Sequence, residues 1–196
     1  MNLESTHAFL KKHVQWDLFF TVVRSLEKSL NSPKLRFYKS DLLELSIEVF
    51  SEKKLVWVDQ TGWDFEIFES DGSNTKIEMK FSENSLRTKK RRDFKAMTSD
   101  IRMQNTLGNN EHRDYSAKFD FLIVCDLDAI ALFSKSEVEL HARKTGDAFV
   151  AKLPLESKHV VTTPSTGTDS QKVTVEKDFK SLIYLTMRSY LGQFKK

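Results

Sequence analysis

Two acids and a lysine, Asp64, Glu78 and Lys80, are the residues of this chain best suited to act together chemically. Two carboxylates that share a small space repel each other unless a cation lies between them, and all-oxygen ligands suit Mg²⁺ or Mn²⁺. Such a metal polarises a phosphate and activates a water, while a neighbouring lysine orients the water and balances charge in the transition state. The three residues are therefore candidate catalytic groups for phosphodiester hydrolysis, with Asp64 and Glu78 as metal ligands.

A hairpin is expected to bring these residues together. Residues 63–68 and 76–82 alternate between apolar and polar side chains, which is typical of strands with one buried face. The dipeptide Asp71-Gly72 between them predicts a tight turn. In such a hairpin the two acids and the lysine share one face, and the opposite face is apolar: Phe65, Ile67, Ile77, Met79 and Phe81.

Asp59 competes with Asp64 for the role of the first acid. Asp59 precedes Thr61-Gly62, where the chain is expected to turn, and lies further from the strand that carries Glu78. Asp64 is therefore preferred. A plainer interpretation is that Glu78 and Lys80 belong to the exposed face of an amphipathic strand, because an acid two residues before a lysine often occurs by chance.

The rest of the pattern predicts helices around a mixed sheet. Helices are expected at residues 3–30, 41–52, 91–104, 136–144 and 177–192, and a break near residues 11–13 is compatible with the first of them. Asp41 is expected to cap the second helix, with Glu44 completing a capping box. Further strands are expected at 55–58, 119–127 and 130–134, and a polar loop at 155–172. This order predicts an α/β (α+β) fold with a central mixed β-sheet flanked by helices.

The order of elements over roughly residues 40–140 resembles the PD-(D/E)XK nuclease superfamily, which includes most type II restriction endonucleases. Trp63-Asp64 matches the first half of the motif, with tryptophan in place of proline, and Glu78-Met79-Lys80 matches the second half. The resemblance implies a restriction-endonuclease-like fold and Mg²⁺ dependence, with Mn²⁺ as a substitute. It also implies the Met79 main-chain carbonyl as a further metal ligand. The family's helix glutamate falls on Glu48 or Glu44, and Glu48 is preferred because Glu44 is already explained as part of a cap.

A basic segment follows the second strand of the hairpin. Between positions 87 and 95 the chain reads RTKKRRDFK, on a body whose net charge is only +3. Arginine and lysine contacts to phosphates supply most nonspecific affinity for DNA. The candidate DNA-binding residues are therefore Arg87, Lys89, Lys90, Arg91, Arg92 and Lys95, although an isolated run of this kind is also typical of a solvated loop.

The composition is that of a globular protein, with 196 residues, 39% hydrophobic and 30% charged, and predicts a single nuclease domain over residues 1–196. An N-terminal helical region (1–33) is expected to precede a catalytic core (40–140). No apolar run is long enough to cross a membrane, and the first residues lack the apolar core of a signal peptide. A single cysteine, Cys125, excludes an internal disulfide, and the five histidines form no metal-binding pattern. A cytoplasmic location is expected.

These features together predict a Mg²⁺-dependent endonuclease that cuts double-stranded DNA, as a type II restriction enzyme does. A homodimer is expected from the habit of that family, because two sites are needed to cut both strands of a palindrome. One alternative is a structure-specific nuclease of the same superfamily, acting on junctions or in repair. Another is a non-catalytic nucleic-acid-binding module whose acids are structural.

Overall fold

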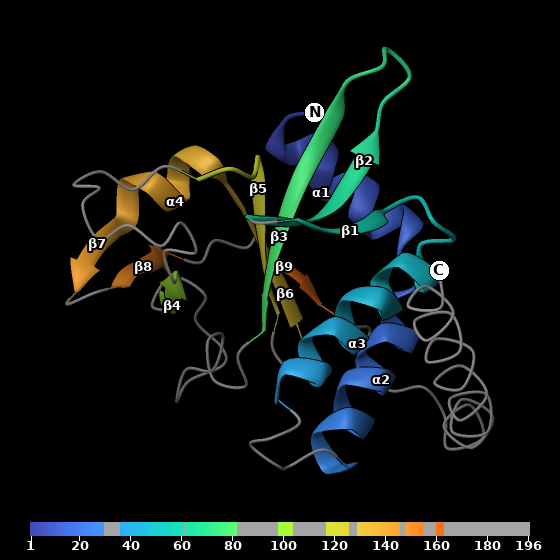
Figure 1. The fold of residues 1–196 in the computed structure, drawn as a ribbon. Coiled ribbons are helices and arrows are strands. Elements are labelled where there is room, and N and C mark those ends of the chain that lie inside the picture. The colour runs from blue at the N-terminus through green and yellow to red at the C-terminus, as the bar shows by residue number, and fades with distance from the viewer. Residues whose placement is uncertain are drawn as a thin grey trace.

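The structure is a computed structural model that describes residues 1–29, 36–60, 62–81, 98–103, 117–125, 129–145, 148–154 and 160–162. Its helices are α1 (Leu3–His13), α2 (Trp16–Ser29), α3 (Arg36–Phe50) and α4 (Lys135–His141). Its strands are β1 (Val56–Gln60), β2 (Trp63–Phe68), β3 (Asn74–Phe81), β4 (Thr98–Met103), β5 (Phe121–Cys125), β6 (Ala129–Ser134), β7 (Ala142–Thr145), β8 (Ala148–Pro154) and β9 (Val160–Thr162) (Figure 1). Helices and a mixed sheet together confirm the predicted α+β class.

The main sheet has six strands in the order β1-β2-β3-β5-β6-β9. The strands pair antiparallel except for β3 and β5, which are parallel. All five residues of β5 are buried, as expected for a central strand covered on both faces. A strand at this position needs helices or a second sheet on each side, and the molecule supplies both.

The predicted hairpin of β2 and β3 is present. Its pairing runs from Phe65 opposite Ile77 to Phe68 opposite Asn74. At the turn Gly72 has a φ of +85°, which L side chains rarely adopt, and the Asp71 carboxylate accepts hydrogen bonds from the Ser73 N–H and hydroxyl. The aspartate-glycine turn therefore fixes the register in which β3 meets β2.

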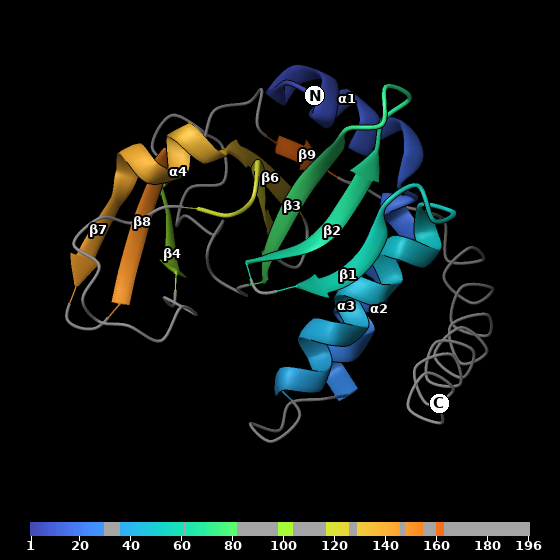
Figure 2. The ribbon, with the colours of Figure 1, turned by 45° about the horizontal axis from the view of Figure 1, so that its top comes forward.

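Two hydrophobic clusters cover opposite faces of the main sheet. One joins α1, α2 and α3 to the apolar side of the hairpin, including Phe65, Ile77 and Met79. The other joins β5 and β6 to α4 and to β8 of the second sheet, including Leu122 and Val124. Figure 2 shows α1 to α3 on one side of the main sheet and α4 with the three-stranded sheet on the other.

The N-terminal region forms two helices rather than one. Asn2 caps α1, and Val14 ends it in an extended conformation. The connection is held by hydrogen bonds from the Gln15 N–H to the Phe50 carbonyl of α3 and from the Trp16 indole to the Leu10 carbonyl. The break near residues 11–13, left open by the pattern, thus falls just after His13, where the chain docks against α3.

Helix α3 begins earlier than the sequence pattern predicts. It starts at Arg36, so Asp41 lies inside the helix and is not its N-cap. The predicted capping box of Asp41 and Glu44 is therefore wrong. This correction matters for the site, because Glu44 had been set aside as a capping residue.

A second sheet has the order β4-β8-β7, and most of it was not predicted. Residues 98–103 were expected to be helical but form strand β4, which pairs with β8 over its whole length. Helix α4 ends at His141 rather than at residue 144, and residues 160–162 of the expected polar loop form β9. Pairing with distant strands outweighs local helix propensity at these positions. The basic segment 87–95 and the expected helix at 177–192 lie outside the described residues.

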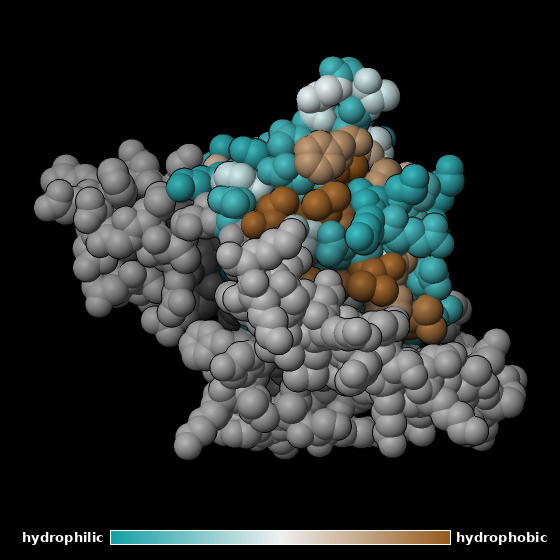
Figure 3. Space-filling view, turned by 45° about the vertical axis from the view of Figure 1, so that its right-hand side comes forward, coloured by the Kyte–Doolittle hydropathy of each residue, from teal (hydrophilic) through white to brown (hydrophobic). Residues whose placement is uncertain are grey.

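The described surface in Figure 3 is mainly hydrophilic, with smaller hydrophobic areas between polar ones. Large apolar side chains that are exposed come from separate parts of the chain: Met1, Val49, Phe68 and Leu140. Among the described helices none is both long enough and apolar enough to cross a membrane.

Candidate active site

Asp64 lies at the point where β2 and β3 stop pairing. The last paired residues at this end are Phe65 and Ile77, and beyond them the Met79 N–H donates to Asp64 Oδ2 at 2.7 Å. The carboxylate therefore takes the place of a main-chain acceptor and is held between the two strands. This contact fixes the first acid relative to the strand that carries the other two candidates.

Glu78 and Lys80 lie on β3 and form an ion pair in which Lys80 Nζ donates to Glu78 Oε1. Their neighbours on the parallel strand β5 are Leu122 and Val124, both fully buried in the cluster beneath α4. In this apolar surrounding the Glu78 side chain is only 10% exposed, whereas the Lys80 side chain is 38% exposed. Glu78 is thus not a residue of a wet strand face, as the plainer interpretation of the sequence assumed.

Glu44 joins the cluster from α3. It is 7% exposed, and its Oε2 accepts a hydrogen bond of 3.0 Å from the Trp57 indole. Its charge acts on both Asp64 and Lys80. Glu48, one turn further along α3, instead accepts from the Trp57 main-chain N–H at 3.4 Å. Of the two helix glutamates, the structure therefore favours Glu44, not the Glu48 that the sequence analysis preferred.

The electrostatics of the cluster show that its carboxylates crowd one another. Burial, together with the charges of Glu78 and Glu44, raises the pKa of Asp64 from 3.8 to about 8, although the Met79 N–H and Lys80 act in the opposite direction. Burial alone lowers the pKa of Lys80, but the nearby carboxylates of Glu78, Asp64 and Glu44 outweigh it, so the pKa of Lys80 is raised. The cluster has more negative charge than its one lysine neutralises.

The donor set fits a hard divalent cation. Carboxylate oxygens are the ligands that Mg²⁺ prefers, and a cation beside Asp64 would offset the burial and the neighbouring charges that raise its pKa. In the described part of the chain, no three His, Cys, Asp or Glu side chains already have the spacing of a metal-binding group. A cation held by these side chains would therefore need the carboxylates to lie closer together than they do here. The Met79 carbonyl as a ligand stays a prediction.

Several other candidates cannot be placed by the structure. Asp59 lies in β1, but its side chain is outside the described set, as are the basic residues Arg87, Lys89, Lys90, Arg91, Arg92 and Lys95.

Trp57 was not singled out in the sequence. Its role depends on a contact with a residue thirteen positions earlier, and no local pattern signals such a contact.

Comparisons with known proteins add no relative to this picture. No protein-family model, no curated protein and no solved structure matches the chain. The functional argument therefore depends on the geometry of Asp64, Glu78, Lys80 and Glu44.

Proposed function

We propose that this protein is a Mg²⁺-dependent nuclease that hydrolyses phosphodiester bonds in double-stranded DNA, with a fold and site like those of the PD-(D/E)XK superfamily. The observation that carries the proposal is the cluster of Asp64, Glu78 and Glu44 with Lys80, drawn from three different elements to one end of the β2–β3 pairing. Burial of Asp64 near two other acids costs stability, and a bound metal would offset that cost, so the raised pKa of Asp64 supports a metal-dependent site.

The acids and the lysine have different roles in this proposal. Asp64, Glu78 and Glu44 would hold the cation. When bound, Mg²⁺ supplies polarisation of the scissile phosphate and a lowered pKa for a water. Lys80 remains protonated at neutral pH, since its pKa is raised, so it serves as a positive charge and a hydrogen-bond donor rather than as a general base.

The surroundings of the site support a polyanionic substrate. The basic segment 87–95 follows β3 in the sequence, a few residues after Phe81. The proposed DNA contacts are made by this segment. We propose in addition that the protein acts as a homodimer, which would bring two sites to the two strands of a duplex, and that its role is restriction.

Cleavage of supercoiled plasmid in Mg²⁺ tests the proposal, with EDTA as the metal-free arm. Glu78→Gln and Lys80→Ala should each lower the cleavage rate on the order of 10²-fold or more. Glu66→Gln is a matched control, because Glu66 lies on the same hairpin but its carboxylate accepts from the Trp63 indole at 3.1 Å. It should cut at close to the native rate.

Two results would refute the proposal in different ways. If the native protein binds DNA but never nicks it with Mg²⁺ or Mn²⁺, the chain is a binding module and the nuclease assignment fails. If Glu78→Gln and Lys80→Ala cut as fast as the native chain, the activity belongs to another site. Branched duplexes assayed in parallel distinguish restriction from junction resolution. Cleavage confined to branched duplexes favours a structure-specific nuclease.

A further inference from the structure

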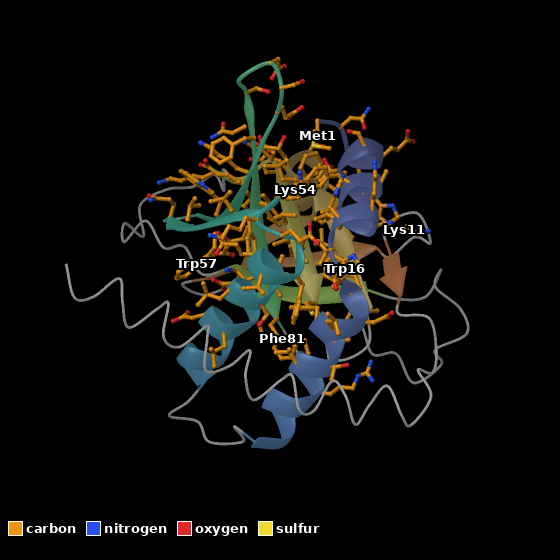
Figure 4. All side chains as sticks on the ribbon, turned by 90° about the vertical axis from the view of Figure 1, so that its right-hand side faces the viewer. Met1, Lys11, Trp16, Lys54, Trp57 and Phe81 are labelled. Carbon is orange, nitrogen blue, oxygen red and sulfur yellow. The ribbon has the colours of Figure 1, made fainter. Side chains whose placement is uncertain are left out.

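Trp57 connects the edge strand β1 to two glutamates of α3. Its indole Nε1 donates to Glu44 Oε2 at 3.0 Å, and its main-chain N–H donates to Glu48 Oε1 at 3.4 Å. Figure 4 shows Trp57 beside α3. One residue therefore holds both glutamates, which lie one helical turn apart on the same side of the helix.

The position of Trp57 also connects Glu44 to the first acid. Trp57 lies opposite Phe65 in the β1–β2 pairing, and Phe65 is the residue directly after Asp64. The Trp57 ring packs against the core cluster that contains Phe65, so the indole donor is held by the same packing that holds β2. The Glu44 carboxylate is thereby positioned relative to the strand that carries Asp64.

A glutamate side chain has three rotatable bonds, and a buried one that must meet a cation needs its carboxylate oriented in advance. We propose that Trp57 is a positioning residue whose indole N–H orients the Glu44 carboxylate for a divalent cation shared with Asp64 and Glu78. This inference rests on the proposed function for the identity of the cation. In this inference Trp57, which lies outside the acid and lysine motif, affects metal affinity through Glu44.

The three tryptophans of the chain allow a direct test by nuclear magnetic resonance. The Trp57 indole donates to Glu44, that of Trp16 to the Leu10 carbonyl and that of Trp63 to Glu66, so each signal reports a different acceptor. With Mg²⁺ alone, the Trp57 signal should shift saturably and the Trp16 signal should stay in place. Glu44→Gln should remove the Mg²⁺-dependent shift while the Trp57 signal remains.

Cleavage gives a second measurement. Trp57→Phe keeps an aromatic ring in the core but lacks the donor, and should raise the Mg²⁺ concentration for half-maximal cleavage about tenfold, as loss of a partner of a metal ligand typically does. The rate at saturating Mg²⁺ should change less than about threefold. Trp16→Phe is the matched control, because it also loses an indole donor, which lies 3.0 Å from the Leu10 carbonyl, and should leave the Mg²⁺ midpoint unchanged.

The outcomes separate this inference from the proposed function. If DNA is cut with the same Mg²⁺ midpoint in native protein and Trp57→Phe, or Mg²⁺ does not move the Trp57 signal, Trp57 is merely structural and the nuclease proposal stands. If Mg²⁺ moves the Trp57 signal through Glu44 but no DNA is cut, the positioning role stands and the nuclease proposal fails. The remaining indole signals and a thermal melt report whether each variant is folded.

Discussion

Asp64→Asn should make the metal-free protein more stable at alkaline pH. In the native protein the Met79 N–H donates to Asp64 Oδ2 at 2.7 Å, and asparagine keeps an oxygen that accepts this hydrogen bond. The substitution removes the negative charge that acts on Glu78 and Glu44. It is therefore nearly isosteric and changes mainly the electrostatic energy of the cluster. Enzymes often gain stability when a strained active site is relaxed in this way.

The magnitude follows from the pKa of Asp64. Raising a carboxyl pKa from 3.8 to about 8 corresponds to about 6 kcal/mol at 1.36 kcal/mol per pKa unit, which is the ceiling for the gain. Asp64 is partly exposed, so water and counterions screen part of this energy, and roughly 1–3 kcal/mol is expected. For a chain of this size that is a rise in Tm of roughly 3–10 °C.

The sign of the pH dependence is fixed by proton linkage. Between about pH 4 and pH 8 the folded chain keeps a proton on Asp64 that the unfolded chain releases, so the stability of the native protein falls as pH rises. Asparagine has no such proton. The difference in Tm between the variant and the native protein should therefore be small near pH 4, grow with pH, and be complete above about pH 8.

Thermal melts in EDTA from pH 4 to pH 9 measure this difference. Adding Mg²⁺ at ten times its Kd should then stabilise the native protein by about 1.4 kcal/mol and the variant much less. Glu66→Gln, on the same strand, should show no gain that grows with pH. If Asp64→Asn is no more stable than the native protein at pH 8.5, or if its advantage does not change with pH, the electrostatic reasoning about the cluster is refuted.

Three further predictions test the site and the fold. Glu44→Gln should weaken Mg²⁺ binding, measured by calorimetry, about tenfold more than Glu48→Gln, because only Glu44 acts electrostatically on Asp64; equal effects would contradict this choice. In urea unfolding, Gly62→Ala should cost roughly 2–3 kcal/mol and Gly72→Ala about 1 kcal/mol. Both glycines have positive φ, but a Cβ added at Gly62 would lie 3.0 Å from the Lys118 side chain, whereas one added at Gly72 would meet open space. A larger loss of stability for Gly72→Ala than for Gly62→Ala would be evidence against this packing. Ser134→Ala should cost about 1 kcal/mol, since its hydroxyl caps α4, and an unchanged urea midpoint would show that the cap is not formed.

The hairpin and the central strand could be predicted from the sequence because their patterns are local. Alternation of apolar and polar residues marks β2 and β3, aspartate-glycine marks their turn, and a continuous apolar run marks β5. The second sheet could not be predicted in this way. Residues 98–103 become a strand because they pair with residues 148–154, and that pairing depends on the chain path between them.

The sequence by itself determined which residue types share the polar face of the hairpin, because a strand alternates its side chains whatever packs around it. Only the tertiary structure decided that Glu78 on this face is buried, that α3 starts at Arg36, and that the charge of Glu44 acts on Asp64. The physical reason is distance along the chain. Glu44, Trp57, Asp64 and Glu78 belong to four elements, and the free energy that brings them together comes from packing the helices on the sheet, which no local pattern encodes.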